Sequence, residues 1–167
     1  FPHSLGMLYG SVTEYLGFRF ASDEGKVMGL APYGDPEVLL PEFRKIVRLE
    51  PNGRYSLDMS YFDYHLYGRG HWVSDKFVRI FGPPRGKAEP IEARHEQVAA
   101  ALQQVTEEVG LHMAEHLRVT TGKRALCIAG GVGLNSVLNG KILQQGLFRD
   151  VFIQPAASDA GTAVGAA

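Results

Sequence analysis

Residues 124–154 alternate strand, helix and strand, and this pattern limits the folds open to the chain. An apolar run predicts a buried strand over 124–129, a glycine turn follows, a helix is predicted over 136–145, and a second strand over 151–154. A helix predicted from Asp159 completes the pattern. Strands joined through a helix pair in parallel, because a parallel pair needs a long crossover connection. The sequence therefore predicts an α/β fold with a C-terminal parallel βαβ unit.

Upstream of this unit, helical patterns dominate. The longest covers 91–120, where apolar residues three or four positions apart predict one stripe on an amphipathic helix. The members of this stripe are Val98, Leu102, Val105, Val109, Met113 and Leu117. Shorter helices are predicted over 4–16, 22–30, 37–49 and 77–81, and a short strand over 54–57. We therefore expect a helix-rich fragment.

The charge of the chain is balanced, with 17 Lys and Arg against 18 Asp and Glu, for a formal net charge of −1. This balance argues against attachment to nucleic acid or to an anionic membrane through overall charge. No apolar run reaches the ~20 residues that span a bilayer, and no signal-peptide pattern opens the chain. We expect a cytoplasmic protein with no nucleic-acid or membrane partner. The one cysteine, Cys127, is predicted to be a buried core residue of its strand.

The two ends predict a piece of a longer protein. The chain opens at Phe1 without an initiator Met and stops at Ala167, inside a helix that lacks a stop signal. With 167 residues and 45% apolar composition, it can still bury a core. We expect residues 1–167 to form one partial domain.

The glycine turn between strand and helix is the first candidate binding site. It reads Ala-Gly-Gly-Val-Gly-Leu-Asn over 129–135. Glycines let a backbone approach a ligand closely, and the free amides at a helix start favour a phosphate or another anion. The alternative is a tight turn that needs glycine for geometry alone. The turn is not a dinucleotide-binding motif, because Ser136 occupies the place of the third glycine, and no P-loop follows, because Ile142 stands where a P-loop has Ser or Thr.

Asp159 follows the second strand, at the edge where ligands gather in open α/β sheets. Aspartate is also a preferred N-cap residue of a helix. From position alone, a ligand role and a helix-cap role both stay open for Asp159.

A second motif suggests a different chemistry. His112-x-x-Glu115-His116 matches the inverted zinc-peptidase motif, and its histidines share one helix face. A zinc peptidase would need a third ligand, on an element that the sequence does not identify. Both histidines border the apolar stripe, so we favour a packing helix and keep the peptidase as the minor alternative.

Three further sets of residues have a structural and a functional interpretation. Glu24 and Lys26, two positions apart, are by themselves surface residues of a short helix. Residues 61–72 are rich in aromatic side chains, which either pack together or stack on nucleic-acid bases. The neutral net charge favours packing. Basic residues exceed acidic ones between 76 and 94, which predicts a solvated surface or a phosphate-facing patch. These basic residues are Lys76, Arg79, Arg85, Lys87 and Arg94.

Four segments carry a family resemblance. They read Phe-Pro-His-Ser-Leu-Gly at 1–6, Glu-Gly-Lys-Val-Met-Gly-Leu-Ala-Pro-Tyr-Gly at 24–34, Leu-Cys-Ile-Ala-Gly-Gly-Val-Gly-Leu-Asn at 126–135 and Gln-Pro-Ala-Ala-Ser-Asp-Ala-Gly at 154–161. Together they resemble the motifs of O-carbamoyltransferases, which modify nodulation factors, aminoglycosides and cephamycins. The resemblance extends from the first residue to the last. Gly133 and Gly25 depart from it, because the family usually has Ala at the first position and often Tyr at the second.

The resemblance implies an actin-like or sugar-kinase-like nucleotide-binding fold, of which this chain would be most of the second lobe. It implies that carbamoyl phosphate and ATP form a carbamoyl-adenylate, whose carbamoyl group then passes to a hydroxyl group of a small-molecule acceptor. It leaves the general base unnamed. The alternative is a nucleotide-binding module of the same fold without transferase activity, or with a threonylcarbamoyl-type cargo.

The resemblance also implies roles for particular residues. Residues of two motifs would contact the nucleotide: Gly130, Gly131, Val132 and Asn135 of the glycine turn, and Glu24 and Lys26. Asp159 matches the aspartate of a site for Fe(II) or another divalent metal. The two histidines that complete this metal site would belong to a first lobe before Phe1. An adenylate-forming domain would follow Ala167.

Overall fold

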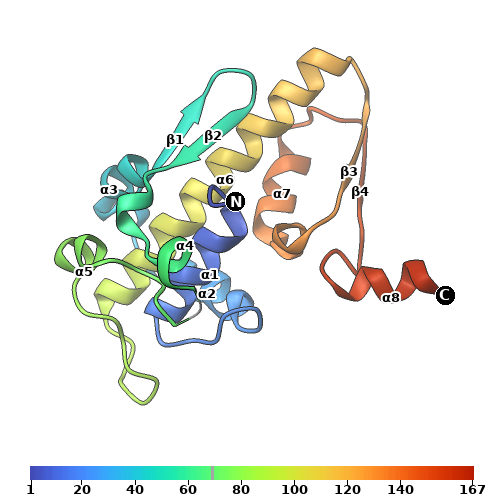
Figure 1. Cartoon of the computed structure of the whole chain (residues 1–167). Coiled ribbons are helices and arrows are strands. Elements are labelled where there is room, and N and C mark those ends of the chain that lie inside the picture. The colour runs from blue at the N-terminus through green and yellow to red at the C-terminus, as the bar shows by residue number, and fades with distance from the viewer. Residues whose placement is uncertain (69) are drawn as a thin grey trace. The chain divides into compact units, whose positions relative to one another are not determined.

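The structure, a computed structural model, describes residues 1–68 and 70–167 (Figure 1). The chain divides into two compact units. The first comprises residues 1–48 and 55–106, and the second comprises residues 49–54 and 107–167.

The first unit is largely helical. Its helices are α1 (Leu5–Tyr15), α2 (Glu24–Leu30), α3 (Leu40–Ile46), α4 (Tyr64–Tyr67), α5 (Asp75–Phe81) and the first half of α6 (Ala93–Thr121). α1 is capped by Ser4, whose hydroxyl accepts a hydrogen bond from the amide of Met7. The helices predicted over 4–16, 22–30 and 77–81 are confirmed within the usual variation of their ends.

Aromatic rings fill the centre of the first unit. The ring of Phe77 lies 5.0 Å from that of Tyr15 and 6.1 Å from that of Phe62, between centroids. Aliphatic side chains surround this cluster with almost no exposed surface: Leu8, Val12, Leu16, Val27, Leu40, Ile46, Val98 and Leu102. Most of them recur at helical spacing, so the apolar periodicity of the sequence marks the faces that pack this core.

The prediction of a helix over 37–49 is wrong at both ends. α3 covers only Leu40–Ile46, and β1 (Val47–Glu50) follows and pairs with β2 (Arg54–Leu57) in a two-stranded sheet. Pro41 lies in the first turn of α3, where its missing N–H is not needed. A helix that began at residue 37 would have placed this proline in its interior. The strand predicted over 54–57 is confirmed.

The second unit contains the predicted βαβ unit. β3 (Ala125–Ile128) and β4 (Asp150–Ile153) run parallel, with Ala125 opposite Asp150. The 3₁₀ turn η4 (Gly131–Leu134) and helix α7 (Ser136–Gln144) connect them, and α8 (Ala160–Ala166) follows β4. The α/β class and the parallel pairing are therefore confirmed.

The described elements cover one face of the β3–β4 pair and leave the other exposed. The covering cluster comprises Ala114, Leu138, Ile142 and Phe148, packed against Leu126, Ile128 and Val151 of the strands. Cys127 and Phe152 alternate with these strand residues and are exposed, Phe152 over 56% of its surface. The prediction of a buried Cys127 is wrong, because no described element covers its face of the sheet.

The apolar stripe of α6 is confirmed in its first half only. The members from Val98 to Val109 are buried, whereas Met113 and Leu117 keep 41% and 43% of their surface exposed. In the second half the covered face is lined by the small residues Gly110 and Ala114, and a Cβ atom at Gly110 would collide with the side chain of Leu138. No described helix is long and apolar enough to cross a membrane.

Candidate functional site

Two loops meet at the carboxyl ends of β3 and β4. The amide of Gly130, in the glycine turn, donates a hydrogen bond of 2.7 Å to the carbonyl oxygen of Ala157. A Cβ atom at Gly133 would lie 3.4 Å from the Cβ of Ala157, so these loops pack closely. Parallel strands end at the same edge of a sheet, and ligands of open α/β folds bind at that edge. The structure therefore brings the glycine turn next to the loop that leads to Asp159.

The glycine turn exposes backbone amides. Gly130 has a φ of 99°, which strongly favours glycine, and no atom lies within 4 Å of a Cβ built at Gly130 or Gly131. The structure draws no hydrogen bond from the amides of Gly131 and Val132 to any described residue. Open glycines with unpaired amides are an arrangement that receives a phosphate or another anion.

Asn135 holds the turn in shape. Its Oδ1 atom accepts a hydrogen bond of 2.9 Å from the amide of Leu138 and so caps α7. Asn139, one turn later, donates from Nδ2 to the carbonyl oxygen of Gly133 at 2.8 Å. The side chains of Asn135, the cap of α7, and Asn139, within α7, thus hold η4 in place. This keeps the amides of the glycine turn in a defined position.

Asp159 lies at the start of α8 with an exposed side chain. Its carboxylate makes no capping hydrogen bond; the backbone carbonyl of Asp159 instead accepts bonds from the amide and hydroxyl of Thr162. The helix-cap interpretation therefore finds no support in this structure, and the carboxylate is available to a ligand. Within residues 1–68 and 70–167, no three His, Cys, Asp or Glu side chains gather into a metal site. A metal at Asp159 would need ligands from outside this chain.

Glu24 and Lys26 belong to the first unit. The Glu24 Oε1 atom accepts a hydrogen bond of 2.6 Å from the amide of Ala21. Lys26 pairs with Asp23 at 2.9 Å and leaves 62% of its side chain exposed. The hydrogen bond from Lys26, together with that from the Arg19 amide, lowers the pKa of Asp23. These residues lie on the exposed side of α2, as expected from the sequence.

Glycines on α2 and just beyond it differ in their surroundings. No atom lies within 4 Å of a Cβ built at Gly25 or Gly29, whereas a Cβ at Gly34 would collide with the carbonyl oxygen of Glu96. Packing explains Gly34, but nothing in the described structure requires glycine at the two helical positions.

The described residues give the zinc-peptidase alternative no support. The Nε2 atom of His112 lies 2.8 Å from the carbonyl oxygen of Glu50 and 3.1 Å from that of Arg54. Both partners are acceptors, so Nε2 carries the proton, and this nitrogen is not free to bind a metal. His116 packs against Gly53 in the same hairpin turn, where a Cβ would lie 2.6 Å from that of His116. The histidine pair holds the turn between β1 and β2.

The expected basic patch is largely a set of structural contacts. The guanidinium of Arg85 donates to the carbonyl oxygens of Leu16, Gly86 and Glu89, and the residue is only 8% exposed. Lys76 pairs with Asp58 at 3.3 Å. A phosphate-binding surface needs basic side chains that are exposed to solvent. Of the five basic residues, only Arg79 and Lys87 are exposed.

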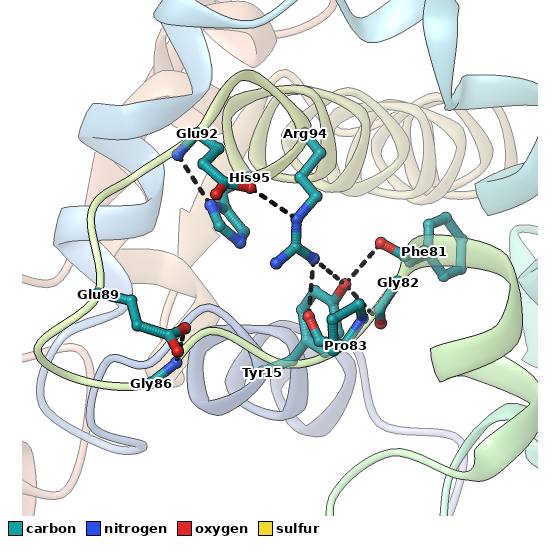
Figure 2. A network of polar contacts seen from close by, with 9 residues as sticks. All are labelled: Tyr15, Phe81, Gly82, Pro83, Gly86, Glu89, Glu92, Arg94 and His95. Carbon is teal, nitrogen blue, oxygen red and sulfur yellow. Dashed lines mark hydrogen bonds and ion pairs between the residues drawn. The ribbon is translucent and has the colours of Figure 1, made fainter.

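Arg94 completes a network at the start of α6 (Figure 2). Its guanidinium contacts the Glu92 carboxylate, the carbonyl oxygen of Pro83 and the hydroxyl of Tyr15. Burial raises the pKa of Tyr15, and Arg94 opposes this shift. The Nδ1 atom of His95 accepts a hydrogen bond of 2.9 Å from the amide of Glu92. The network fixes the loop between α5 and α6.

The aromatic segment packs on itself, as favoured from the sequence. Tyr61, Phe62 and Tyr64 are at most 4% exposed. Trp72 stacks on Phe20 with ring centroids 4.5 Å apart. Tyr67 keeps 68% of its surface exposed, so packing accounts for most rings of the segment but not for all of them.

The sequence analysis did not predict one concave site. A pocket of about 460 Å³ on the first unit is lined by Glu14, Arg19, Phe20, Ala21, Ser22 and Trp72. These residues come from α1, the following loop and the end of the aromatic segment, so no local motif joins them. The only signal was the one tryptophan of the chain, at position 72.

Comparisons with known proteins agree with the resemblance seen in the motifs. The sequence matches the family described as carbamoyltransferase N-terminus over residues 1–167. It is 44% identical over its whole length to an uncharacterized protein, sll1178, of Synechocystis, of which it covers 27%. It is 42% identical to nodulation protein NolO of Bradyrhizobium diazoefficiens, over 99% of the chain and 28% of that protein.

A third relative has an activity in its name. The 3'-hydroxymethylcephem-O-carbamoyltransferase of Streptomyces clavuligerus is 31% identical over 87% of the chain and 25% of that protein. The chain thus spans about a quarter of the length of these relatives. Because the family match covers every residue, the chain belongs to the carbamoyltransferase family, within its N-terminal part.

Proposed function

We propose that the complete protein containing this chain transfers a carbamoyl group to a hydroxyl group of a small molecule. The observation that carries the proposal is the family match over residues 1–167, together with a relative named for O-carbamoyl transfer. The chain contributes part of the catalytic domain.

We further propose that the donor is made from carbamoyl phosphate and ATP as a carbamoyl-adenylate. In the transfer step, the acceptor oxygen bonds to the carbamoyl carbon, the bond from that carbon to AMP breaks, and the hydroxyl proton leaves to a base. Phosphate charge must be neutralised for this step, and preorganised backbone amides do so without reorganising.

The open glycine turn is suited to bind the phosphate groups of the nucleotide. The amides of Gly131 and Val132 have no partner among the described residues, and Gly130 leaves room for a ligand to approach closely. In the first unit, Lys26 offers an exposed ammonium beside the open glycines of α2. We assign nucleotide contacts to both sets of residues.

The free carboxylate of Asp159 suits one ligand position of a divalent metal such as Fe(II). Such a metal, when bound, would neutralise nucleotide phosphates and orient them. Asp159 contributes one anionic oxygen, and the remaining ligands, histidines by the family resemblance, would come from another part of the parent protein.

We propose that the chain belongs to the second lobe of an actin-like nucleotide-binding domain. Support comes from the β3–β4 pair, whose outer edges pair with no described strand and whose second face exposes Cys127 and Phe152. Parallel sheets are normally covered on both faces, so further elements of the parent protein fit here. The chain alone should therefore fold but catalyse nothing.

Pyrophosphate release by the complete protein tests the proposed function without knowledge of the acceptor. We expect release that requires both ATP and carbamoyl phosphate, with AMP and a product heavier by one carbamoyl group once an acceptor is added. Release that requires threonine and bicarbonate instead would favour the threonylcarbamoyl-type cargo. No release under either condition would contradict transfer through an adenylate, and turnover by residues 1–167 alone would contradict a shared site.

A further inference from the structure

The α5–α6 loop, residues 82–92, is held by polar contacts that the proposed function does not use. The amide of Arg85 donates a hydrogen bond of 2.9 Å to the carbonyl oxygen of Tyr15, and its Nε atom donates one of 2.6 Å to that of Leu16. Both carbonyl groups lie at the end of α1, where the helix itself offers no donor. A Cβ atom at Gly17 would lie 2.7 Å from the carbonyl oxygen of Arg85. The loop therefore closes the end of α1.

His95 fastens the other end of the loop to the first turn of α6 (Figure 2). Its Nδ1 atom accepts a hydrogen bond of 2.9 Å from the amide of Glu92, and the carbonyl oxygen of Glu92 accepts one of 2.8 Å from the amide of His95. Glu92 precedes α6, and His95 is the third residue of the helix. In a capping box, Glu or Gln at this third position accepts from the amide of the cap residue. His95 replaces it with an acceptor that a proton can remove.

The closed loop accepts only the neutral imidazole of His95. Because Nδ1 is an acceptor, the ring proton is on Nε2, which is buried and has no hydrogen-bond partner among the described residues. A second proton would have to bind to Nδ1, where it would face the N–H group of Glu92, donor against donor. The ring is 1% exposed, so water does not reach it to solvate a positive charge. Protonation and the closed loop are therefore incompatible.

The charged groups around His95 offset one another. Burial is the largest cause that lowers the pKa of His95, and four charged side chains add to or oppose it: Arg94 and Arg85 lower the pKa, whereas Glu92 and Glu89 raise it. From α1, the Tyr15 hydroxyl joins the network through Arg94, and burial raises its pKa, so it stays neutral below pH 8. Where the segment after α2 packs on α6, Gly34 meets the backbone of Glu96. Two carboxylates against two guanidinium groups leave no excess negative charge to hold a protonated ring.

We propose that His95 is a pH-sensitive latch, which releases the α5–α6 loop when a proton on Nδ1 breaks its bond to Glu92. Once the loop is open, the hydrated ring binds a proton with the ordinary pKa of about 6.5, whereas the closed ring binds one only at lower pH. The latch is therefore closed above pH 6.5 and opens progressively as the pH falls below it. Between pH 7.5 and 5.5, the equilibrium constant for opening rises by up to about tenfold.

Hydrogen exchange of the complete protein, followed by mass spectrometry at pH 7.5 and 5.5, tests the latch. Labelling times are scaled to the intrinsic exchange rate at each pH, so that the opening equilibrium alone is compared. We expect protection of peptides within 82–92 to fall about five- to tenfold at pH 5.5, and to be lower than that of α3 at both pH values. His95→Gln should remove most of this fall, because glutamine is a capping-box acceptor that does not titrate. His71→Gln, which changes an exposed histidine of the same unit, should keep it.

Each outcome supports or overturns the latch. A fall of less than about twofold in the wild type, or an equal fall in His95→Gln, overturns it. Loop amides that exchange as slowly as those of α3 also overturn it, because the loop would then open only when the whole unit unfolds. If His95→Gln fails to fold by circular dichroism, His95→Glu decides, since glutamate is the usual capping-box residue at this position. The exchange measurement uses neither ATP nor an acceptor, so its outcome is separate from that of the pyrophosphate assay.

Discussion

The Nε2 atom of His112 donates to the carbonyl oxygen of Glu50 across 2.8 Å. A histidine from a motif that matches a zinc peptidase thus acts as a hydrogen-bond donor to a hairpin turn. Its partner in the motif, His116, packs against Gly53 of that turn. In this arrangement the Nε2 atom of His112 is not free for a metal.

Replacing both histidines should therefore affect stability and leave metal binding unchanged. We expect His112→Ala to lower the free energy of unfolding by about 1 kcal/mol, because the carbonyl oxygens of Glu50 and Arg54 lose their shared donor. The double variant with His116→Ala should retain the full metal content of the complete protein. Elemental analysis measures the metal, and a stoichiometric loss in the double variant would restore the zinc interpretation.

His95 predicts a pH dependence of stability. Burial, followed by the charge of Arg94, lowers the pKa of His95 from its ordinary value of 6.5. The residue is 1% exposed, and its Nε2 atom has no hydrogen-bond partner among the described residues. The unfolded chain therefore binds a proton at a higher pH than the folded chain, and the free energy of unfolding decreases as pH falls below about 7.

Urea titrations between pH 8 and 5 measure this decrease. In His95→Gln the dependence should become shallower, because the group that takes up the proton on unfolding is gone. His71→Gln is the control, since His71 is exposed and its loss should leave the slope unchanged. Equal slopes for the wild type and His95→Gln would exclude His95 as the source.

Gly29 and Gly34 should respond in opposite ways to the same substitution. Gly29→Ala adds a methyl group in open space on α2 and should stabilise the chain by roughly 0.5–1 kcal/mol. Gly34→Ala forces a methyl group against the Glu96 backbone and should destabilise it by about 1–3 kcal/mol. Thermal melts measure both effects.

The open glycine also tests the nucleotide site. If a nucleotide approaches α2 beside Lys26, Gly29→Ala should raise the KM for ATP of the complete protein in spite of its greater stability. A stabilised variant with an unchanged KM would show that no ligand needs the space at Gly29.

The sequence predicted those parts of the fold whose signals are local. The βαβ unit follows from apolar runs and a glycine turn, and α1 follows from apolar residues at helical spacing. Burial was harder to predict, because it depends on neighbours far along the chain. Cys127, in an apolar context that predicted burial, lies on an uncovered sheet face, and the buried Arg85 donates to the carbonyl oxygen of Leu16, 69 positions away.

In the candidate sites, too, residues with a local motif were predicted and residues brought together by the fold were not. Motif matching identified the glycine turn and Asp159, which the structure places on adjoining loops. The pocket beside Trp72 was missed because Trp72 lies 50 positions after Ser22, the last of the other lining residues, and no sequence pattern joins them. A site assembled by tertiary structure has no signature in one sequence.

The absence of a capping bond at Asp159 makes Asp159→Asn a decisive substitution. Because the carboxylate caps nothing in α8, the melting temperature should stay within about 2 °C, whether or not the new amide can cap. Asparagine keeps the size of the side chain but removes the anionic oxygen that a divalent cation prefers. Metal content and carbamoyl transfer by the complete protein should therefore fall at least tenfold, which corresponds to about 1.4 kcal/mol of transition-state stabilisation.

Ser158→Ala is the matched control, because Ser158 is exposed on the same loop and offers no anionic oxygen to a metal. It should keep both metal and activity. Elemental analysis and the pyrophosphate assay on the same preparations separate loss of metal from loss of chemistry. An Asp159→Asn protein that binds metal and turns over like the wild type would show that the free carboxylate at this sheet edge is not a ligand. The amides of Gly131 and Val132 would then have to hold the nucleotide without a metal beside them.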